Sequence, residues 1–176
     1  MKATIKIDSA DIVYRHHPSP LGPLLLAARP AGLSGVYYEQ HSHFAGSAGW
    51  QPVEQHALLD LAARQLDEYF AGQRKRFDLP LAPVGTPFQQ AVWQGLRQIP
   101  WGETCHYGDL AVAIERPRAV RAVGAANGRN PLSIIVPCHR VIGRSGDLVG
   151  YAGGLQRKQF LLALEHQDSM PGLFAA

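Results

Sequence analysis

The chain has 176 residues, of which 46% are hydrophobic and 18% are charged. This composition is ordinary for a globular protein and argues against disorder. No apolar run approaches the roughly 20 residues of a membrane span, and the first residues lack the continuous apolar core of a secretory signal. We therefore expect a cytoplasmic protein without a membrane partner, folded as one large domain or two small ones.

Positive charge is concentrated in one segment, although the net charge is only +3. Between Arg116 and Arg144 there are six arginines and no acidic residue. Such a basic stretch suits a phosphate backbone, and a solvated face near a domain edge would show the same pattern. Nucleic acid is therefore a candidate partner.

The first half of the chain, up to about Leu81, has the pattern of short strands and one helix. Four brief runs rich in apolar or β-prone residues, separated by SPLGP and RPAG turn signals, predict a small antiparallel sheet. They are residues 4–7, 12–17, 24–29 and 33–38. Apolar residues at helical spacing from Leu58 to Phe70, ended by Gly72, predict an amphipathic helix that covers one face of the sheet.

The segment LPLAPVG, residues 79–85, predicts a boundary between an N-terminal domain (residues 1–81) and a mostly helical domain (residues 82–176). Directly after it, Thr86, Pro87 and Gln89 are typical of a helix start, with threonine as the cap and glutamine completing a capping box.

Two further helices are predicted at residues 107–114 and 118–126, with the turn ERP between them. Two short helices around a tight turn are the outline of a helix-turn-helix, although a generic helical hairpin would look the same. The second helix is rich in alanine, valine and glycine, and its only long side chains are Arg118 and Arg121. It packs either into its own core or against a nucleic acid groove.

The segment VPCHRVI, residues 136–142, places Cys138 directly before His139. Since nothing marks the chain for export and cytosolic thiols are kept reduced, we expect Cys138 and the other cysteine, Cys105, to be free thiols. A thiol beside an imidazole is a nucleophile, part of a metal site or an inert core residue. Sequence neighbours in extended chain point to opposite sides, so adjacency alone does not decide between these alternatives.

Six segments together resemble the O6-alkylguanine-DNA alkyltransferase family, in the family's order. They are GTPFQQAVW, IPWGET, YGDLA, RAVGAANGRNP, IIVPCHRVIG and GYAGGLQRKQFLLALE, from about Gly85 to Glu165. The resemblance implies an α+β protein, in which a ribonuclease-H-like N-terminal domain precedes a winged-helix-like domain with a helix-turn-helix. It also implies irreversible transfer of an alkyl group from guanine O6, and from thymine O4, in double-stranded DNA to a cysteine. Neighbouring chains could contact one another on the DNA.

The same resemblance assigns the reacting residues. Cys138 would be the nucleophile, activated through a water by His139, which Glu165 would orient. Asn130 would tie the recognition helix to the active-site turn, and the Tyr107 hydroxyl would bind guanine N3.

The resemblance also places residues around the substrate base. Val141 and Ala152 would offer backbone groups to the guanine edge, Tyr151 would wall the pocket, and Gly153 and Gly154 would let the chain turn closely around the base.

On the DNA side, guanine O6 lies inside the stack, so the base must be flipped out at a cost of a few kcal/mol. By resemblance, Arg121 fills the gap, and small residues let its helix enter the minor groove without reading sequence. Binding should therefore be sensitive to salt. The expected DNA-binding residues are Arg118, Arg121, Ala122, Gly124, Ala125 and Arg140.

The chain departs from the family pattern at three places. His106 stands where serine or threonine is common and Glu115 where glycine is frequent, which leaves the loop geometry there open. Some relatives hold zinc in the first domain, but no cysteine precedes Cys105 here. The histidines at 41, 43 and 56 make a weak site without thiolate, so we predict no metal and no cofactor.

Two alternatives to an active alkyltransferase are weaker. A lesion-binding relative that does not repair would lack the cysteine that Cys138 supplies. A cysteine hydrolase would need an oxyanion motif, and a helix-turn-helix regulator would need a dimerisation segment or effector domain, and neither is evident in the sequence.

Overall fold

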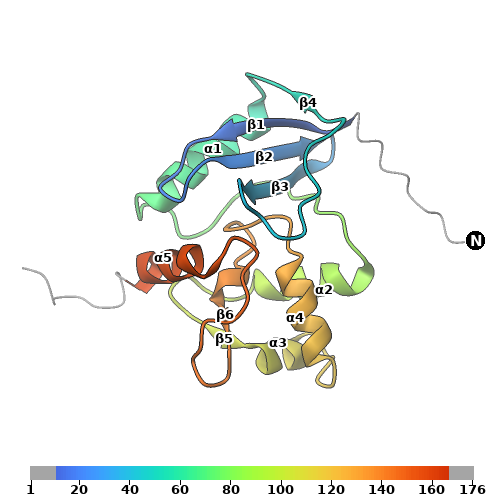
Figure 1. The fold of residues 1–176 in the computed structure, drawn as a ribbon, viewed down its shortest axis with the longest axis vertical. Helices are drawn as coiled ribbons and strands as arrows, with labels where there is room; N and C mark the ends of the chain where they lie inside the picture. The colour runs from blue at the N-terminus through green and yellow to red at the C-terminus, as the bar shows by residue number, and fades with distance from the viewer. Residues whose placement is uncertain (1–10, 167–176) are drawn as a thin grey trace, which may run out of the picture.

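The computed structural model describes residues 11–166. The first half of the chain is built on a four-stranded sheet (Figure 1). The strands are β1 (Val13–His17), β2 (Leu24–Arg29), β3 (Gly32–Tyr38) and β4 (Gln51–Pro52). They lie in the order β3-β2-β1-β4. The pairs β1–β2 and β2–β3 are antiparallel, as predicted, but β4 pairs in parallel with β1, so the sheet is mixed. The strand expected at residues 4–7 lies outside the described residues.

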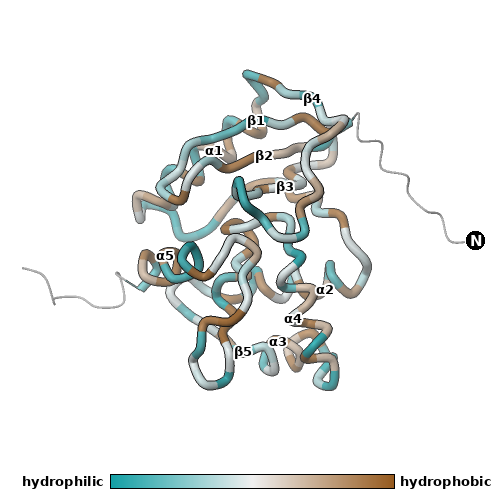
Figure 2. Tube along the Cα trace, viewed as in Figure 1, coloured by the Kyte–Doolittle hydropathy of each residue, from teal (hydrophilic) through white to brown (hydrophobic). Residues whose placement is uncertain are grey.

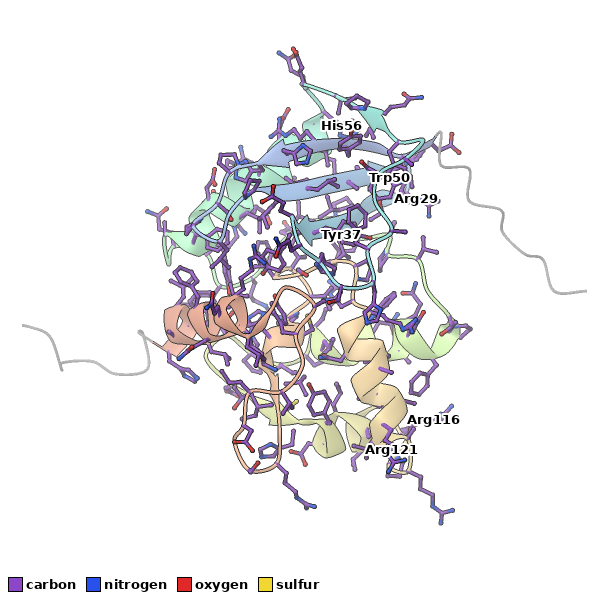
Figure 3. All side chains as sticks on the ribbon, in the orientation of Figure 1. Arg29, Tyr37, Trp50, His56, Arg116 and Arg121 are labelled. Carbon is purple, nitrogen blue, oxygen red and sulfur yellow. The ribbon has the colours of Figure 1, made fainter. Side chains whose placement is uncertain are left out.

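Strand β2 is buried along nearly all of its length because both faces of the sheet are covered. Helix α1 (Ala57–Phe70) lies across one face, as its apolar spacing predicted, and buries Leu59 and Leu66 against the sheet. Aromatic side chains cover the other face, where Tyr37 stacks on Phe44 at 4.1 Å between ring centroids. Trp50 lies beside them (Figure 3). This second layer comes from residues far apart in the sequence and is not predicted by the local pattern.

Helix α2 (Pro87–Leu96) opens the second half of the chain with the predicted capping box. The Thr86 side chain accepts a hydrogen bond from the backbone of Gln89, and the Gln89 side chain accepts one from the backbone of Thr86. The indole of Trp93 donates to the carbonyl of Ala126 at 2.9 Å. This bond joins α2 to a helix that follows later in the chain.

Helices α3 (Tyr107–Ala113) and α4 (Val120–Gly128) form the helix-turn-helix at the lower end of the molecule in Figure 1. The backbone N–H groups of Glu115 and Arg116 bond to carbonyls of the last turn of α3. Glu115 has a φ of 59°, in the left-handed region that favours glycine at such helix ends. Helix α4 starts two residues later than predicted because Pro117 lies in a turn closed by the N–H of Ala119 and the carbonyl of Arg116.

The chain then passes through a short 3-10 helix, η2 (Cys138–Arg140), and the last described element is helix α5 (Leu155–His166). Between these helices β6 (Val141–Ile142) pairs in parallel with β5 (Cys105–His106). The α+β fold that the sequence indicated is confirmed.

One hydrophobic core runs through both halves of the chain. It joins buried side chains of the sheet, such as Val36, to Val92 of α2 and Leu161 of α5. Figure 2 shows brown, hydrophobic segments in β2 and again among the helices below it, with teal at the outer loops. None of the helices within residues 11–166 is long and apolar enough to cross a membrane.

Candidate active site

The segment that leads into Cys138 is held by two unusually tight turns. A backbone hydrogen bond of 2.8 Å closes a three-residue turn around Ile134, and another of 2.8 Å closes one around Pro137. Ile134 is only 1% exposed and has a φ of 72°, a strained conformation for a β-branched residue. The N–H of Val36 in β3 donates to the carbonyl of Pro131, and the carbonyl of Val36 accepts from the N–H of Ser133. These two bonds hold the segment against the sheet. Cys138 therefore follows a segment that is tied to the sheet and contains one strained residue, Ile134.

The side chain of Asn130 contacts both this turn and the sulfur of Cys138. Its Nδ2 donates to the carbonyl of Val136 at 2.8 Å and lies 3.1 Å from Sγ of Cys138. Its Oδ1 accepts from the N–H of Leu132 at 3.0 Å. Asn130 thus contacts both the backbone of the turn and the candidate nucleophile.

The thiol of Cys138 is buried and has a raised pKa. It is 2% exposed, and burial raises its pKa to about 11, although the Asn130 hydrogen bond and the positive charge of Lys158 act in the opposite direction. The sulfur therefore rests as a neutral thiol near pH 7. A nucleophilic thiolate has to be formed by proton transfer during the reaction.

Glu165 lies at the centre of a buried polar cluster. Its Oε1 accepts from the Tyr69 hydroxyl at 2.6 Å and lies 2.7 Å from Nε2 of His139. The guanidinium of Arg140 donates to both carboxylate oxygens, at 2.8 and 3.0 Å. Burial opposes the negative charge on Glu165, but the hydrogen bonds and positive charges of its partners outweigh it and lower its pKa to about 2. Glu165 is therefore an ionised carboxylate.

The contact with Glu165 fixes the proton on His139. A carboxylate only accepts hydrogen bonds, so Nε2 of His139 carries the hydrogen and Nδ1 keeps its lone pair. Nδ1 is buried without a hydrogen-bond partner among residues 11–166. Burial also lowers the pKa of His139, so the ring is neutral and can accept a proton. These are the properties of a general base.

The position of Arg140 differs from the one expected from the sequence. We expected it at the DNA surface, but it is 6% exposed and its guanidinium is turned inward. Besides Glu165, it donates to the carbonyl of Ile99 at 2.6 Å. A buried guanidinium needs an ionised partner, which Glu165 supplies. Arg140 therefore belongs to the buried cluster.

The expected substrate residues Tyr107, Tyr151 and Ala152 are held by hydrogen bonds to other segments of the chain. The hydroxyl of Tyr151 lies 2.9 Å from that of Tyr38 in β3, and the carbonyl of Ala152 accepts from Ser42 at 2.9 Å. The Tyr107 hydroxyl donates to the carbonyl of Val149 at 3.2 Å. Burial raises the pKa of both Tyr107 and Tyr151, and a negative charge on Cys138 would act in the same direction.

Gly153 lies tight against the first half of the chain. A Cβ at Gly153 would lie 2.4 Å from the ring of Tyr38, so only glycine allows this approach. Gly154 has a φ of 89° and turns the chain into α5.

Lys158 is a site residue that the sequence analysis missed. It is fully buried on α5, and its Nζ donates to the carbonyls of Val141 at 2.6 Å and Val149 at 3.1 Å. Its charge also favours the thiolate of Cys138. A signal was present, because Lys158 and Glu165 share a helical face with the buried Leu161 and Leu162.

The expected DNA-binding residues lie mainly on the outer side of α4. The helix buries Val123, Ala126 and Asn127 and exposes the opposite face. Figure 3 shows Arg116 and Arg121 extending from the lower end of the molecule. On or beside this face, Arg118, Arg121, Ala122 and Ala125 are exposed, and Gly124 is half-buried.

Cys105 and the histidines of the first half have separate surroundings. Cys105 is half-buried in β5, and burial together with the negative charge of Asp109 raises its pKa to about 11. Burial lowers the pKa of His41 to about 4, with smaller contributions from His43 and Arg157. No group of three or more His, Cys, Asp or Glu side chains within the described part of the chain is arranged to hold a metal.

A buried thiol, a neutral imidazole held by a carboxylate, and a helix-turn-helix with exposed arginines are features expected of a DNA-binding protein with a cysteine nucleophile. Two family models match the chain. The ribonuclease-like domain of 6-O-methylguanine DNA methyltransferase matches residues 12–83, and its DNA binding domain matches residues 87–167. The chain belongs to the 6-O-methylguanine DNA methyltransferase family.

Similar proteins carry matching names. A methylated-DNA–protein-cysteine methyltransferase from Methanosarcina barkeri is 50% identical over 151 residues, which cover 85% of this chain and 94% of the relative. One from Mycobacterium leprae is 48% identical over 159 residues, covering 90% and 95%. The crystal structure of Mycobacterium tuberculosis OGT in complex with DNA superposes with a TM-score of 0.83 at 47% identity, covering 88% of this chain and 93% of that one.

Proposed function

We propose that this protein repairs O6-alkylguanine, and O4-alkylthymine, in double-stranded DNA by moving the alkyl group onto the sulfur of Cys138. The observation that carries this proposal is a buried thiol, held by Asn130, next in the chain to His139, whose Nδ1 has no partner among the described residues and can receive the thiol proton through a water. Glu165 fixes the required tautomer. The role of each residue follows from these contacts.

In the proposed reaction the proton of Cys138 passes to His139, and Glu165 stabilises the imidazolium that forms. The thiolate attacks the alkyl carbon, a C–S bond forms, and the bond from that carbon to O6 breaks with its electron pair moving to guanine. The Tyr107 hydroxyl donates a hydrogen bond to guanine N3 in place of its present acceptor, the carbonyl of Val149, and the proton taken up by His139 balances the negative charge left on the guanine. Lys158 and Asn130 stabilise the thiolate before attack. Because the thioether is stable, each molecule reacts once.

Access to guanine O6 requires the base to leave the stack. Arg121 is exposed on α4 with small residues beside it, which suits insertion from the minor groove into the space of the flipped base. Few side chains on this face could read base edges. Binding should therefore depend on phosphate contacts, fall with salt and vary little with sequence.

The alternative is a protein that binds the lesion without repairing it. The intact set of Cys138, His139 and Glu165 favours repair, since a binding protein has no use for a general base beside a thiol. A thiol nucleophile also needs a reducing compartment, which supports a cytoplasmic location.

The experiment is a single-turnover assay with a duplex that carries O6-methylguanine labelled on the methyl group. The wild-type protein should remove one label per molecule and then stop, and the label should remain with the protein. Cys138→Ala should bind the duplex as tightly and transfer no label. Repeated turnover, or transfer by Cys138→Ala, would contradict the proposal.

A further inference from the structure

The first half of the chain contributes a hydroxyl group to the cluster around Glu165. Tyr69 lies in the last turn of α1 and is fully buried. Its hydroxyl donates to Oε1 of Glu165 at 2.6 Å, across 96 positions of sequence. None of the steps proposed for alkyl transfer uses this contact.

Tyr69 and His139 share one carboxylate oxygen. Oε1 of Glu165 accepts from the Tyr69 hydroxyl at 2.6 Å and lies 2.7 Å from Nε2 of His139, and the guanidinium of Arg140 also donates to it at 3.0 Å. Glu165 is ionised, and burial raises the pKa of Tyr69 well above its ordinary value, so the tyrosine stays neutral and is the donor. Its hydrogen bond therefore acts on the same atom that orients the imidazole.

The ring of Tyr69 has little freedom to move. It packs against Phe70, Phe77 and Trp101, with ring centroids 5.5, 5.4 and 5.2 Å away. Helix α1 is in turn held against the sheet by Leu59 and Leu66. The hydroxyl is consequently a fixed donor, and Glu165 is restrained by a segment outside the helix-turn-helix half.

We propose that Tyr69 is a positioning residue for alkyl transfer. It holds the Glu165 carboxylate in the orientation in which His139 keeps its proton on Nε2 and its lone pair on Nδ1. It also withdraws charge from Oε1, which moderates how strongly the carboxylate stabilises the imidazolium. The N-terminal half is then a working part of the reaction centre. This inference rests on the proposed function.

The test compares Tyr69→Phe with wild type in the single-turnover assay between pH 5.5 and 9. Loss of the hydroxyl should slow transfer roughly tenfold, a modest share of the 10²- to 10⁴-fold that a general base contributes. It should leave Oε1 more negative and raise the pKa of His139, which moves the acidic limb of the rate profile to higher pH. Affinity for undamaged duplex should not change.

Tyr37→Phe is the matched control, because Tyr37 packs on Phe44 at the opposite face of the sheet (Figure 3). It should leave both the rate and the profile unchanged. Wild-type rate and profile in Tyr69→Phe would overturn this inference alone. Absence of transfer by the wild-type protein would overturn the proposed function, and with it this inference.

A second measurement uses the wild-type protein and therefore does not depend on whether Tyr69→Phe folds. With ring-labelled tyrosine, NMR should show a slowly exchanging hydroxyl proton on Tyr69 from pH 5.5 to 9, together with His139 protonated on Nε2. A Tyr69 hydroxyl that exchanges at the rate of a solvent-exposed one would overturn the inference.

Discussion

Replacing Glu165 by glutamine should separate the stability of the buried cluster from its chemistry. In Glu165→Gln the guanidinium of Arg140, which is 6% exposed, loses its ionic partner and keeps the carbonyl of Ile99. Breaking a buried pair from one side costs about 3–5 kcal/mol, and we expect about 3 because that carbonyl remains. At about 2–4 °C per kcal/mol for a chain of this size, the melting temperature should fall by roughly 10 °C.

The double variant Arg140→Met/Glu165→Gln removes both charges together. Its stability should lie within about 1 kcal/mol of wild type, because no unpaired charge remains buried and methionine fills part of the vacated volume. Alkyl transfer should nevertheless stay about 100-fold slow, since His139 still lacks a carboxylate to stabilise its imidazolium.

Urea unfolding of wild type, Glu165→Gln, Arg140→Met and the double variant gives the coupling free energy between the two side chains, and single-turnover assays give the rates. Additive stability losses in the double variant would refute the assignment of Arg140 to the buried pair. Recovery of the wild-type rate by the double variant would refute the role of Glu165 toward His139.

Three further predictions concern separate parts of the molecule. Glu115→Gly should raise the free energy of unfolding by about 0.5–1 kcal/mol in urea titrations, because Glu115 has a φ of 59°; a loss of stability would contradict this. The pKa of Glu165 is lowered from 4.5 to about 2, so its contribution of about 3 kcal/mol is complete above about pH 4.5 and lost as the pH falls toward 2. Acid titration of Glu165→Gln should therefore show a flatter loss of stability in that range, and an unchanged slope would contradict it. Arg121→Ala should slow repair in duplex by at least tenfold while sparing transfer from the free base, whereas Arg116→Ala should only weaken binding; equal losses on both substrates would contradict base flipping by Arg121.

Local features of the fold could be predicted from the sequence. The capping box at Thr86 and Gln89 uses residues three positions apart, so its chemistry is visible in the sequence. The start of α4 was misplaced by two residues because the turn at Pro117 resembles a first helical turn. The sequence pattern does not predict the parallel strand β4, because only two residues, Gln51 and Pro52, form it.

The candidate site depended on contacts between distant segments. Arg140 belongs to the arginine-rich stretch 116–144, which predicts a DNA contact, and only the fold brings Glu165 to it. Tyr69 was assigned to the apolar face of α1, and nothing local indicates that its hydroxyl reaches α5. Lys158 could have been found, because a lysine in line with buried leucines needs an internal partner.

The central claim is that one particular sulfur receives the alkyl group. Peptide mapping by mass spectrometry, after reaction with duplex containing O6-methylguanine, tests it most directly. The peptide with Cys138 should gain the mass of one methyl group in every reacted molecule, and the peptide with Cys105 should be unchanged. A methyl group on Cys105 or any other residue, with Cys138 unmodified, would contradict the account.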